Sequence, residues 1–303
     1  MFPWCAGLAL LLGGCDLIYG VNGRVDVEID AGTSEPCMLG SPFPAGTPVQ
    51  IGDLGYSVEG ARFSADQQAA YLSLCTLGQP KSTCELWRAR YIASEKRFAE
   101  LFQLDQLDQS GAYDAYPTIT ANGRFFLWAS DRNSHLDVYV ATEENGQFPA
   151  SRIVKLAAAE GIASNEPYVL SDSETVYFGG MDAANDWEIY RSRGPGPDFG
   201  TRQVVTSLGS PYGEAAPVVS DDELEIFFAS ERDSPDSYDI FTAIRTNKND
   251  PFGAVTKLGA LSTPSPGIDW PLWLSPDLCT LYYINKDSDA DTATARLFVT
   301  NRR

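Results

Sequence analysis

Five acidic side chains stand just ahead of, or at the start of, five similar apolar segments in this 303-residue sequence. They are Glu59, Asp114, Glu166, Glu214 and Asp269. If these segments are strands of a ring, the five carboxylates approach one mouth of its central tunnel. Clustered carboxylates can bind a cation, attract a basic segment of a partner protein, or supply the acid and the base of glycoside cleavage. The alternative is that each acid accepts hydrogen bonds from free backbone N–H groups where its strand starts.

Few other residues have the spacing that catalysis, metal binding or ligand binding requires. Trp270, beside the last acid, could stack on a sugar or a peptide, although its position also fits the core. The single histidine, His135, excludes a multi-histidine metal site, and there is no G-x-S-x-G motif and no glycine-rich phosphate loop. The run 287–291 alternates aspartates as calcium loops do, but Thr292 replaces the turn glycine and Phe298 the bidentate glutamate. We therefore assign no catalytic residue, metal or cofactor, and keep calcium as a weak alternative.

The apolar segments belong to a repeat of about 50 residues, a length typical of arrays of supersecondary units. Its turn residues are Asp66, Asn122, Asp172, Asp222 and Asp277, at spacings of 56, 50, 50 and 55 residues. After each turn comes an apolar run without alternation, such as Phe125-Phe126-Leu127-Trp128, which indicates a strand buried on both faces. An acid-aliphatic-aromatic triplet such as Asp239-Ile240-Phe241 follows, and then a strand that ends in leucine.

Each unit thus contains four short antiparallel strands, and radial packing of such sheets gives a β-propeller. We predict an all-β, five-bladed propeller of four-stranded antiparallel blades over residues 47–303. The fifth unit has only five residues after Phe298, too few for a fourth strand. Because the segment 47–54 matches the missing strand, we expect it to pair with the C-terminal blade and close the ring.

The clearest repeat runs from Ala215 to Phe241, and from Pro217 on it has the pattern P-x-x-S-x-D, an apolar run, S-x-R and D-I-aromatic. This pattern resembles the WD40-like PD40 repeat of TolB-type β-propellers, and the stretch from Cys37 to Phe43 resembles a lipoprotein subset of that family. The resemblance covers residues 47–303 and implies a periplasmic scaffold, a peptidase domain or a ligand sensor, so it predicts fold better than function. Five-bladed propellers resembling arabinanases place carboxylates at a tunnel mouth, which makes a glycan-acting enzyme the alternative.

The N-terminus predicts an export signal and an anchor. Residues 1–14 form an apolar stretch too short to span a bilayer, and we interpret them as a signal peptide. The residues Leu12-Gly13-Gly14-Cys15 resemble a bacterial lipobox, which implies that Cys15 becomes lipidated and holds the protein at a membrane surface. Residues 15–46, rich in glycine, proline and serine, are then the lipidated cysteine and a flexible tether.

Four cysteines lie beyond the signal peptide and the lipobox, an even number in a chain expected outside the cytoplasm. Three pairings are possible. Cys75 and Cys84 flank one predicted hairpin loop and are the favoured pair. Cys37 and Cys279 are left, and a bond between them would fix the tether to the closing blade. Four free thiols are the alternative.

The net charge of the chain indicates which kinds of partner it can bind. The net charge is −19, from 41 acidic and 22 basic residues, and it repels phosphate backbones, so we predict no nucleic-acid partner. We expect a lipid-anchored monomer in a bacterial cell envelope, on the periplasmic or cell-surface side, that binds an envelope protein or a glycan as a scaffold. A spacer without any ligand is the remaining alternative.

Overall fold

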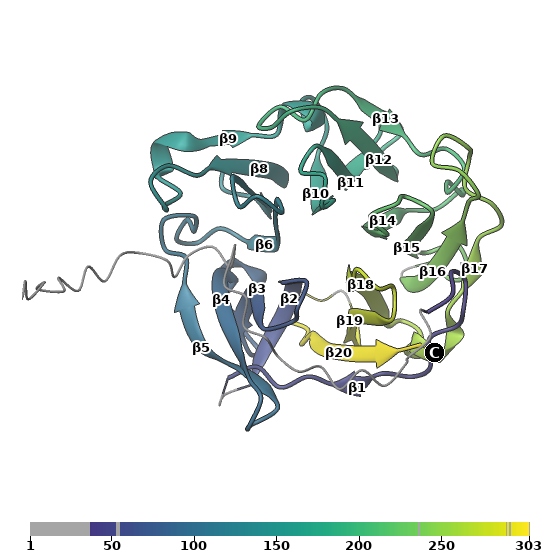
Figure 1. Ribbon diagram of the computed structural model, residues 1–303, viewed down its shortest axis with the longest axis horizontal. Helices are drawn as coiled ribbons and strands as arrows, with labels where there is room; N and C mark the ends of the chain where they lie inside the picture. The colour runs from purple at the N-terminus through teal and green to yellow at the C-terminus, as the bar shows by residue number, and fades with distance from the viewer. Residues whose placement is uncertain (1–36, 53–54, 236, 289, 291, 303) are drawn as a thin grey trace, which may run out of the picture. The chain divides into compact units, whose positions relative to one another are not determined.

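The computed structural model describes residues 37–52, 55–235, 237–288, 290 and 292–302. These residues form five four-stranded antiparallel sheets, which stand around a common axis as the blades of a propeller (Figure 1). The predicted all-β, five-bladed fold is confirmed. Among the described residues the helices are single 3₁₀ turns, η1 (Lys81–Thr83), η2 (Ala150–Arg152), η3 (Ala157–Ala159) and η4 (Gly259–Leu261). No helix in this part of the chain is long and apolar enough to cross a membrane.

Each blade follows the order of its sequence repeat, and blade 5 combines both ends of the chain. Blade 1 consists of β2 (Tyr56–Phe63), β3 (Ala69–Thr76), β4 (Glu85–Ile92) and β5 (Arg97–Gln103). Blade 2 consists of β6 (Asp114–Ile119), β7 (Phe125–Ser130), β8 (Asp137–Thr142) and β9 (Ile153–Lys155). Blade 3 consists of β10 (Ser164–Val169), β11 (Thr175–Met181), β12 (Trp187–Arg193) and β13 (Arg202–Val204). Blade 4 consists of β14 (Glu214–Val219), β15 (Glu225–Ser230), β16 (Asp239–Ile244) and β17 (Thr256–Lys257). Blade 5 consists of β18 (Ile268–Leu274), β19 (Thr280–Lys286), β20 (Arg296–Asn301) and β1 (Thr47–Pro48).

The second strand of each blade supplies much of the core. All six residues of β7 and all six of β15 are buried, because each sheet is covered on both faces by its neighbours. The predicted two-faced burial of these apolar runs is confirmed. We call the end of the ring where the first strands of the blades begin the mouth face, and the end where they turn into the second strands the turn face.

The turns themselves are built by short polar side chains. In blade 4 the hydroxyl of Ser220 donates to Asp222 Oδ1 at 2.6 Å, and the same oxygen accepts the N–H of Leu224 at 3.0 Å. Glu223, inside this turn, has a φ of 60°. The same serine or threonine to Asx contact occurs in the pairs Ser64–Asp66, Thr120–Asn122 and Ser275–Asp277. The S-x-D element of the repeat is therefore a turn-forming device.

The first strands bulge where they pass the axis. The bulge residues with positive φ are Tyr116 at 53°, Glu166 at 51° and Ala216 at 49°. Each precedes a proline, which lacks an N–H and is tolerated because the tunnel edge of the sheet has no pairing strand. Blade 1 has Gly60 here instead, since a Cβ at that position would lie 2.7 Å from the Cα of Tyr116. Close backbone approach at the axis thus selects glycine and proline.

The ring closes as the sequence predicts. In blade 5, Thr47 pairs with Val299 and Pro48 with Phe298 in antiparallel register. A few residues later the chain reaches blade 1, where the N–H of Gly52 donates to the carbonyl of Phe98 at 2.7 Å. The N-terminal segment therefore joins the last blade to the first.

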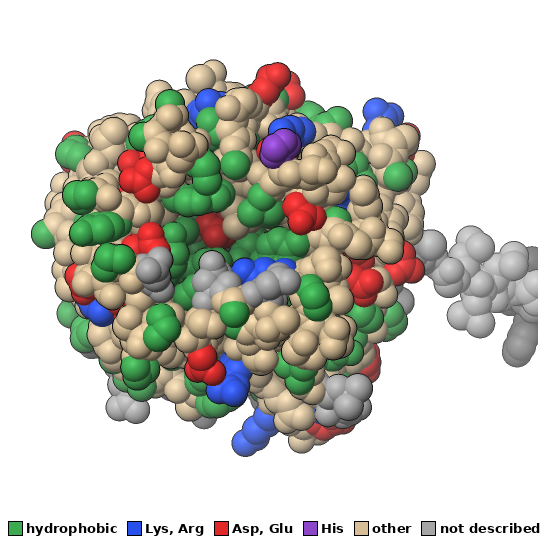
Figure 2. Space-filling model, turned by 180° about the vertical axis from the view of Figure 1, so that it is seen from behind, with side chains coloured by type: hydrophobic (Ala, Val, Ile, Leu, Met, Phe, Trp, Pro, Cys, Tyr) green, Lys and Arg blue, Asp and Glu red, His purple; other side chains and the backbone are tan. Residues whose placement is uncertain are grey.

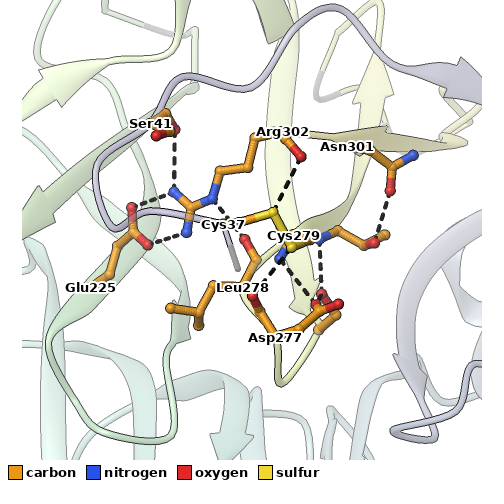
Figure 3. The surroundings of a disulfide bond; sticks show 10 residues. Cys37, Ser41, Glu225, Asp277, Leu278, Cys279, Asn301 and Arg302 are labelled. Atoms are coloured by element: carbon orange, nitrogen blue, oxygen red, sulfur yellow. Dashed lines mark hydrogen bonds and ion pairs between the residues drawn. A yellow bond between two sulfur atoms is a disulfide. The ribbon is translucent and has the colours of Figure 1, made fainter. Parts of the chain in front are cut away.

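A disulfide and an ion pair reinforce this closure on the turn face (Figure 3). Cys37 is bonded to Cys279, which lies just before β19. Close by, both guanidinium Nη atoms of Arg302 donate to the carboxylate of Glu225, at 2.8 and 2.6 Å, and both side chains are fully buried. The Arg302 guanidinium also lies 4.8 Å from the ring centroid of Phe43, which is itself buried. We call these five residues the closing latch.

Both predicted disulfides are present, because Cys75 at the end of β3 is bonded to Cys84 just ahead of β4. Residues 37–46, which we assigned to the tether, include the buried Phe43 and lie against blades 4 and 5 through the closing latch. The predicted signal peptide, Cys15 and the rest of the tether are outside the described residues.

The two disulfides differ in the loops that they close, with sequence separations of 242 and 9 residues. In the chain-entropy model the longer loop restricts the unfolded chain more, by about 5 kcal/mol against about 3 kcal/mol. We expect the double variant Cys37→Ser/Cys279→Ser to lower the free energy of unfolding more than Cys75→Ser/Cys84→Ser does, as measured by reversible denaturant unfolding. An equal or smaller loss in the first variant would contradict a role for the closing latch in stability.

Candidate functional site

Three of the five predicted site acids occupy the same place in their blades. Asp114 pairs with Ser130, Glu214 with Ser230, and Asp269 with Asn285 in the neighbouring second strand. All three carboxylates are buried, at 1% exposure or less. We call them the start acids.

The start acid of blade 2 binds both backbone and side-chain donors. Asp114 Oδ2 accepts the N–H of Gln109 at 2.9 Å, and its Oδ1 accepts the indole N–H of Trp128 at 3.0 Å and Arg132 Nη2 at 2.7 Å. Arg132 Nη2 also donates to the carbonyl of Leu107 at 2.6 Å. The carboxylate therefore holds the connection from blade 1 against its own blade.

Blade 4 repeats this arrangement. Glu214 accepts the backbone N–H of Ser210 at 3.2 Å and the Ser230 hydroxyl at 2.9 Å. Arg232 Nη2 donates to Glu214 Oε1 at 3.1 Å and to the Leu208 carbonyl at 2.6 Å. The S-x-R element of the repeat thus supplies the cation that neutralises the start acid, a pairing that the sequence alone did not reveal.

Blade 5 has no arginine at this position. Asp269 accepts the N–H of Thr263 at 2.7 Å, the Thr263 hydroxyl at 3.1 Å and the side-chain amide of Asn285. Burial without a cationic partner raises the pKa of Asp269 to about 6.

Glu59 lies elsewhere, in a buried network that reaches across the ring junction. Its carboxylate pairs with the ammonium of Lys286, and both side chains have at most 1% exposure. The hydroxyl of Tyr113 donates to Glu59 Oε2 at 3.4 Å and accepts a hydrogen bond from the hydroxyl of Tyr116, 3.1 Å away. Burial, reinforced by the charge of Glu59 and by other neighbours, raises the pKa of both tyrosines well above their usual value. The tyrosines are therefore neutral donors at physiological pH.

Trp270 belongs to the same network. Its ring lies 4.8 Å from the Lys286 ammonium nitrogen and packs against Tyr116 and Tyr238, with ring centroids 5.6 and 6.1 Å away. The side chain is 8% exposed. The structure places Trp270 in packing contacts, beside a cation of the protein itself.

Glu166 is the fifth predicted acid and the one that lines a cavity on the axis. It is the bulge residue of β10, and its Oε2 accepts the N–H of Ala216 in the next blade at 2.7 Å. Its Oε1 accepts the side-chain amide of Asn165 at 3.1 Å. Glu59 and Glu166 therefore approach the axis near Tyr113 and Tyr116, whereas the start acids lie in separate hydrogen-bonded settings.

The cavity is narrow, with a volume of about 20 Å³, and is lined by the first strands of all five blades. Pro117, Pro167, Pro217 and Pro271 contribute apolar walls. Arg62 and Glu166 contribute charges of opposite sign. In space-filling view, one face of the ring has a central hollow lined by hydrophobic side chains, with acidic and basic groups at its centre (Figure 2).

Metal binding finds no support in the described residues, which contain no group of three or more histidine, cysteine or acidic side chains able to hold an ion. The predicted weak calcium loop cannot be placed, because residues 289 and 291 lie outside the described residues.

Two further acids at the seams between blades escaped the sequence reasoning. Burial, together with the charges of Glu214, Asp186 and Asp182, raises the pKa of Glu188 to about 7. Burial likewise raises the pKa of Asp108 to about 7, and Asp114 and Glu85 add to the effect. No simple spacing identifies Asp108, because it lies in the connection between blades 1 and 2.

In two other blades, the acid that corresponds to Glu188 is neutralised by a lysine ammonium group on the fourth strand. Lys155 pairs with Asp137 at 2.7 Å, and Lys257 pairs with Asp239 at 2.6 Å. The position that corresponds to these lysines in blade 3 is Val204, which pairs in register with Tyr190 as Lys257 does with Phe241. Glu188 therefore lacks the cation that its counterparts have.

No protein-family model and no curated protein sequence matches the chain. Among solved structures, the fold is similar to TolB from Acinetobacter baumannii, with a TM-score of 0.52 and 14% identity over 81% of this chain and 55% of that chain. It is equally similar to the catalytic domain of Coprinopsis cinerea GH62 alpha-L-arabinofuranosidase, with a TM-score of 0.52 and 14% identity over 86% of this chain and 97% of that chain. At these identities the likeness shows a shared propeller fold, and the chain spans little more than half the length of the TolB structure.

The raised pKa of Glu188 makes stability depend on pH. The folded protein binds a proton on Glu188 that the unfolded chain releases near pH 4.5, so the stabilisation is complete below that pH and is lost as pH rises through about 7. We expect Val204→Lys to lower the pKa of Glu188 and to reduce the loss of unfolding free energy between pH 5 and 8. Because Glu188 is partly exposed, solvent screening limits the gain at pH 8 to about 0.5–1 kcal/mol.

The matched control is Val154→Lys, since Val154 is exposed on the fourth strand of blade 2 one residue from Lys155. Urea unfolding at pH 5, 6.5 and 8 measures all three proteins. The same pH profile in wild type and Val204→Lys would show that Glu188 is not the titrating group.

Proposed function

We propose that the protein is a lipid-anchored, extracytoplasmic binding scaffold of the PD40-type lipoprotein propellers, active as a monomer. The observation that carries the proposal is the engagement of the start acids. Asp114, Glu214 and Asp269 each accept a backbone N–H from the connection ahead of their strand, and they are at most 1% exposed. Carboxylates held in this way stabilise the mouth face and its loops, which leaves those loops free to vary for binding.

The position of the closing latch supports one orientation of this scaffold at the membrane. Cys279 precedes β19 on the turn face, whereas Lys286 ends β19 beside Glu59 near the mouth, about 20 Å away for a strand of this length. A lipid on Cys15 lies 22 residues ahead of Cys37, and a flexible tether of that length has a root-mean-square span of about 25 Å. The turn face is then nearest the membrane, and the mouth face is presented to the envelope space.

The partner that fits is an envelope protein or a glycan with a basic surface. A net charge of −19 attracts cationic surfaces and opposes nucleic acid. The structural likeness to an arabinofuranosidase domain supports the fold alone. A glycosidase needs two available carboxylates about 5–10 Å apart across the bond to be cleaved, and Glu59 is already paired with Lys286.

Site-specific crosslinking in intact cells tests both the binding and the orientation. A photoreactive residue at His135, in the exposed loop between β7 and β8, samples the mouth face, and one at the exposed Glu174 samples the turn face. We expect a discrete crosslinked product from position 135 and none from position 174. In addition, Cys15→Ser should move the protein from the membrane fraction to the soluble fraction.

Equal crosslinking at the two positions, or none at position 135, would contradict the scaffold with an outward mouth. Hydrolysis of arabinoxylan by the purified protein, lost in both Glu59→Gln and Glu166→Gln, would replace the scaffold by a glycan-acting enzyme. If Cys15→Ser stays in the membrane fraction, the proposed lipid anchor at Cys15 is excluded. The crosslinks would still test the binding proposal.

A further inference from the structure

Three apolar side chains are exposed on the turn face, beside the closing latch. Met38 is 72% exposed, Leu39 39% and Ile244 45%. Met38 and Leu39 directly follow Cys37 in the chain. A Cβ placed on Gly40 would lie 3.7 Å from Ile244 Cδ1, so this N-terminal segment and the end of β16 are neighbours. We call Met38, Leu39 and Ile244 the apolar patch.

Hydrogen bonds hold the patch in place, although it faces solvent. The N–H of Ser41 donates to the Met38 carbonyl at 3.1 Å and closes a turn, in which Gly40 has a φ of 74°. Glu225 Oε1 accepts the N–H of Gly40 at 3.1 Å, and Arg302 Nη1 donates to the Ser41 carbonyl at 3.2 Å (Figure 3). The end of β16 pairs in register with Glu225 itself. The closing latch therefore joins both parts of the patch.

Three charged side chains next to the patch are turned inward. Arg245, which follows β16, donates to the Glu223 carbonyl at 2.6 Å and lies 4.2 Å from the ring centroid of Phe252. Its side chain is only 7% exposed. Arg302 and Glu225 are fully buried. The patch thus presents apolar groups to solvent, and exposed apolar surface of this kind marks a contact site for a protein or a membrane.

The position of the patch along the chain favours a membrane. Cys15, the proposed lipidation site, lies 22 residues ahead of Cys37, and Met38 is the next residue. A flexible tether of that length has a root-mean-square span of about 25 Å, so the bilayer is present at a high effective concentration and a small apolar contact suffices for docking. Asp222 and Asp277 are exposed in the turns of the same face, and their charge favours a zwitterionic surface over an anionic one.

We propose that the apolar patch inserts into the interfacial region of a zwitterionic phospholipid bilayer, so that the propeller docks on the membrane by its turn face. The methionine, leucine and isoleucine side chains enter the boundary between headgroups and acyl chains. This inference rests on the proposed lipid anchor and deepens it. The anchor alone leaves the propeller free to rotate on its tether, whereas a second contact fixes the direction of the mouth face.

Photolabelling from the acyl chains tests the docking. The full-length lipidated protein is reconstituted into phosphatidylcholine vesicles that contain a phosphatidylcholine with a diazirine on its acyl chain. Flotation of the vesicles shows whether the anchor holds, and mass spectrometry after irradiation locates the labelled residues. The reference is Leu77, which is 43% exposed and follows β3 on the mouth face. We expect about tenfold or more labelling at the patch than at Leu77, because the eight residues of β3 span about 25 Å.

Two variants assign the contact. Met38→Ser/Leu39→Ser/Ile244→Thr should still float with the vesicles, since its anchor is unchanged, while labelling of the turn falls to the level of the mouth-face reference. Phe102→Ser/Val154→Thr is the matched control, because these two exposed apolar residues lie on the outer strands of blades 1 and 2. Its turn should be labelled as in the wild type. All five side chains are exposed, so both variants should unfold as the wild type does.

Protein that floats but is labelled no more at the patch than at Leu77 overturns the docking and leaves the lipid anchor standing. Protein that does not float contradicts the anchor and, with it, the docking. Unchanged labelling in the patch variant, or an equal loss in the control, also overturns the docking.

In intact cells, a photoreactive residue at position 38 should form phospholipid adducts. A discrete protein adduct at this position would assign the patch to a protein partner and contradict the membrane contact. Crosslinking at position 135 reports on the mouth face independently, so the docking and the binding of a mouth-face partner fail separately.

Discussion

The structure depends on one constraint, that a sheet with two apolar faces needs a neighbour on each side. Strands such as β7 and β15 are buried along their whole length, so an open array of five blades would leave two apolar faces in water. A closed ring removes both faces. Closure requires the ends of the chain to meet, and blade 5 therefore takes its outer strand, β1, from the N-terminus. The closing latch adds a disulfide and a buried ion pair at the same junction.

Close packing between blades also buries the acidic side chains that lie in the seams, so each of them needs hydrogen-bond donors or a cation nearby. A carboxylate buried there is tolerated only with donors around it. Asp114 and Glu214 each have backbone N–H groups and an arginine, whereas Asp269 has amide and hydroxyl donors alone and an accordingly raised pKa. Glu59 uses a lysine from across the ring junction. The same kind of residue thus has three different surroundings, because the seams supply different partners.

Much of the fold follows from local sequence signals. Each of these signals depends on a few neighbouring residues and can be recognised in a single sequence. They are the S-x-D turns, the unbroken apolar runs and the strand-like segment 47–54. The candidate site is harder, because its contacts join residues such as Glu59 and Lys286 that are 227 positions apart. Bulges add to the difficulty. The first strands of blades 2, 3 and 4 bulge at the same place, and Glu166, which stands two residues nearer its turn than Asp114 does, takes the bulge position on the axis, whereas Asp114 takes the start of its strand. Arg62 has no motif at all, and only the ring places it beside Tyr168.

The position of the Cys37–Cys279 bond determines how the propeller responds to a mechanical pull. A force on the chain ahead of Cys37 passes through covalent bonds into Cys279 and then along β19, an interior strand that is paired with β18 on one side and β20 on the other along most of its length. The two paired residues of β1, Thr47 and Pro48, lie behind the bond and are shielded from that force. A tether joined directly to β1 would peel the short edge strand away one hydrogen bond at a time. The disulfide instead directs tension into strands that must slide past each other together, so the ring stays closed while its N-terminus is under tension.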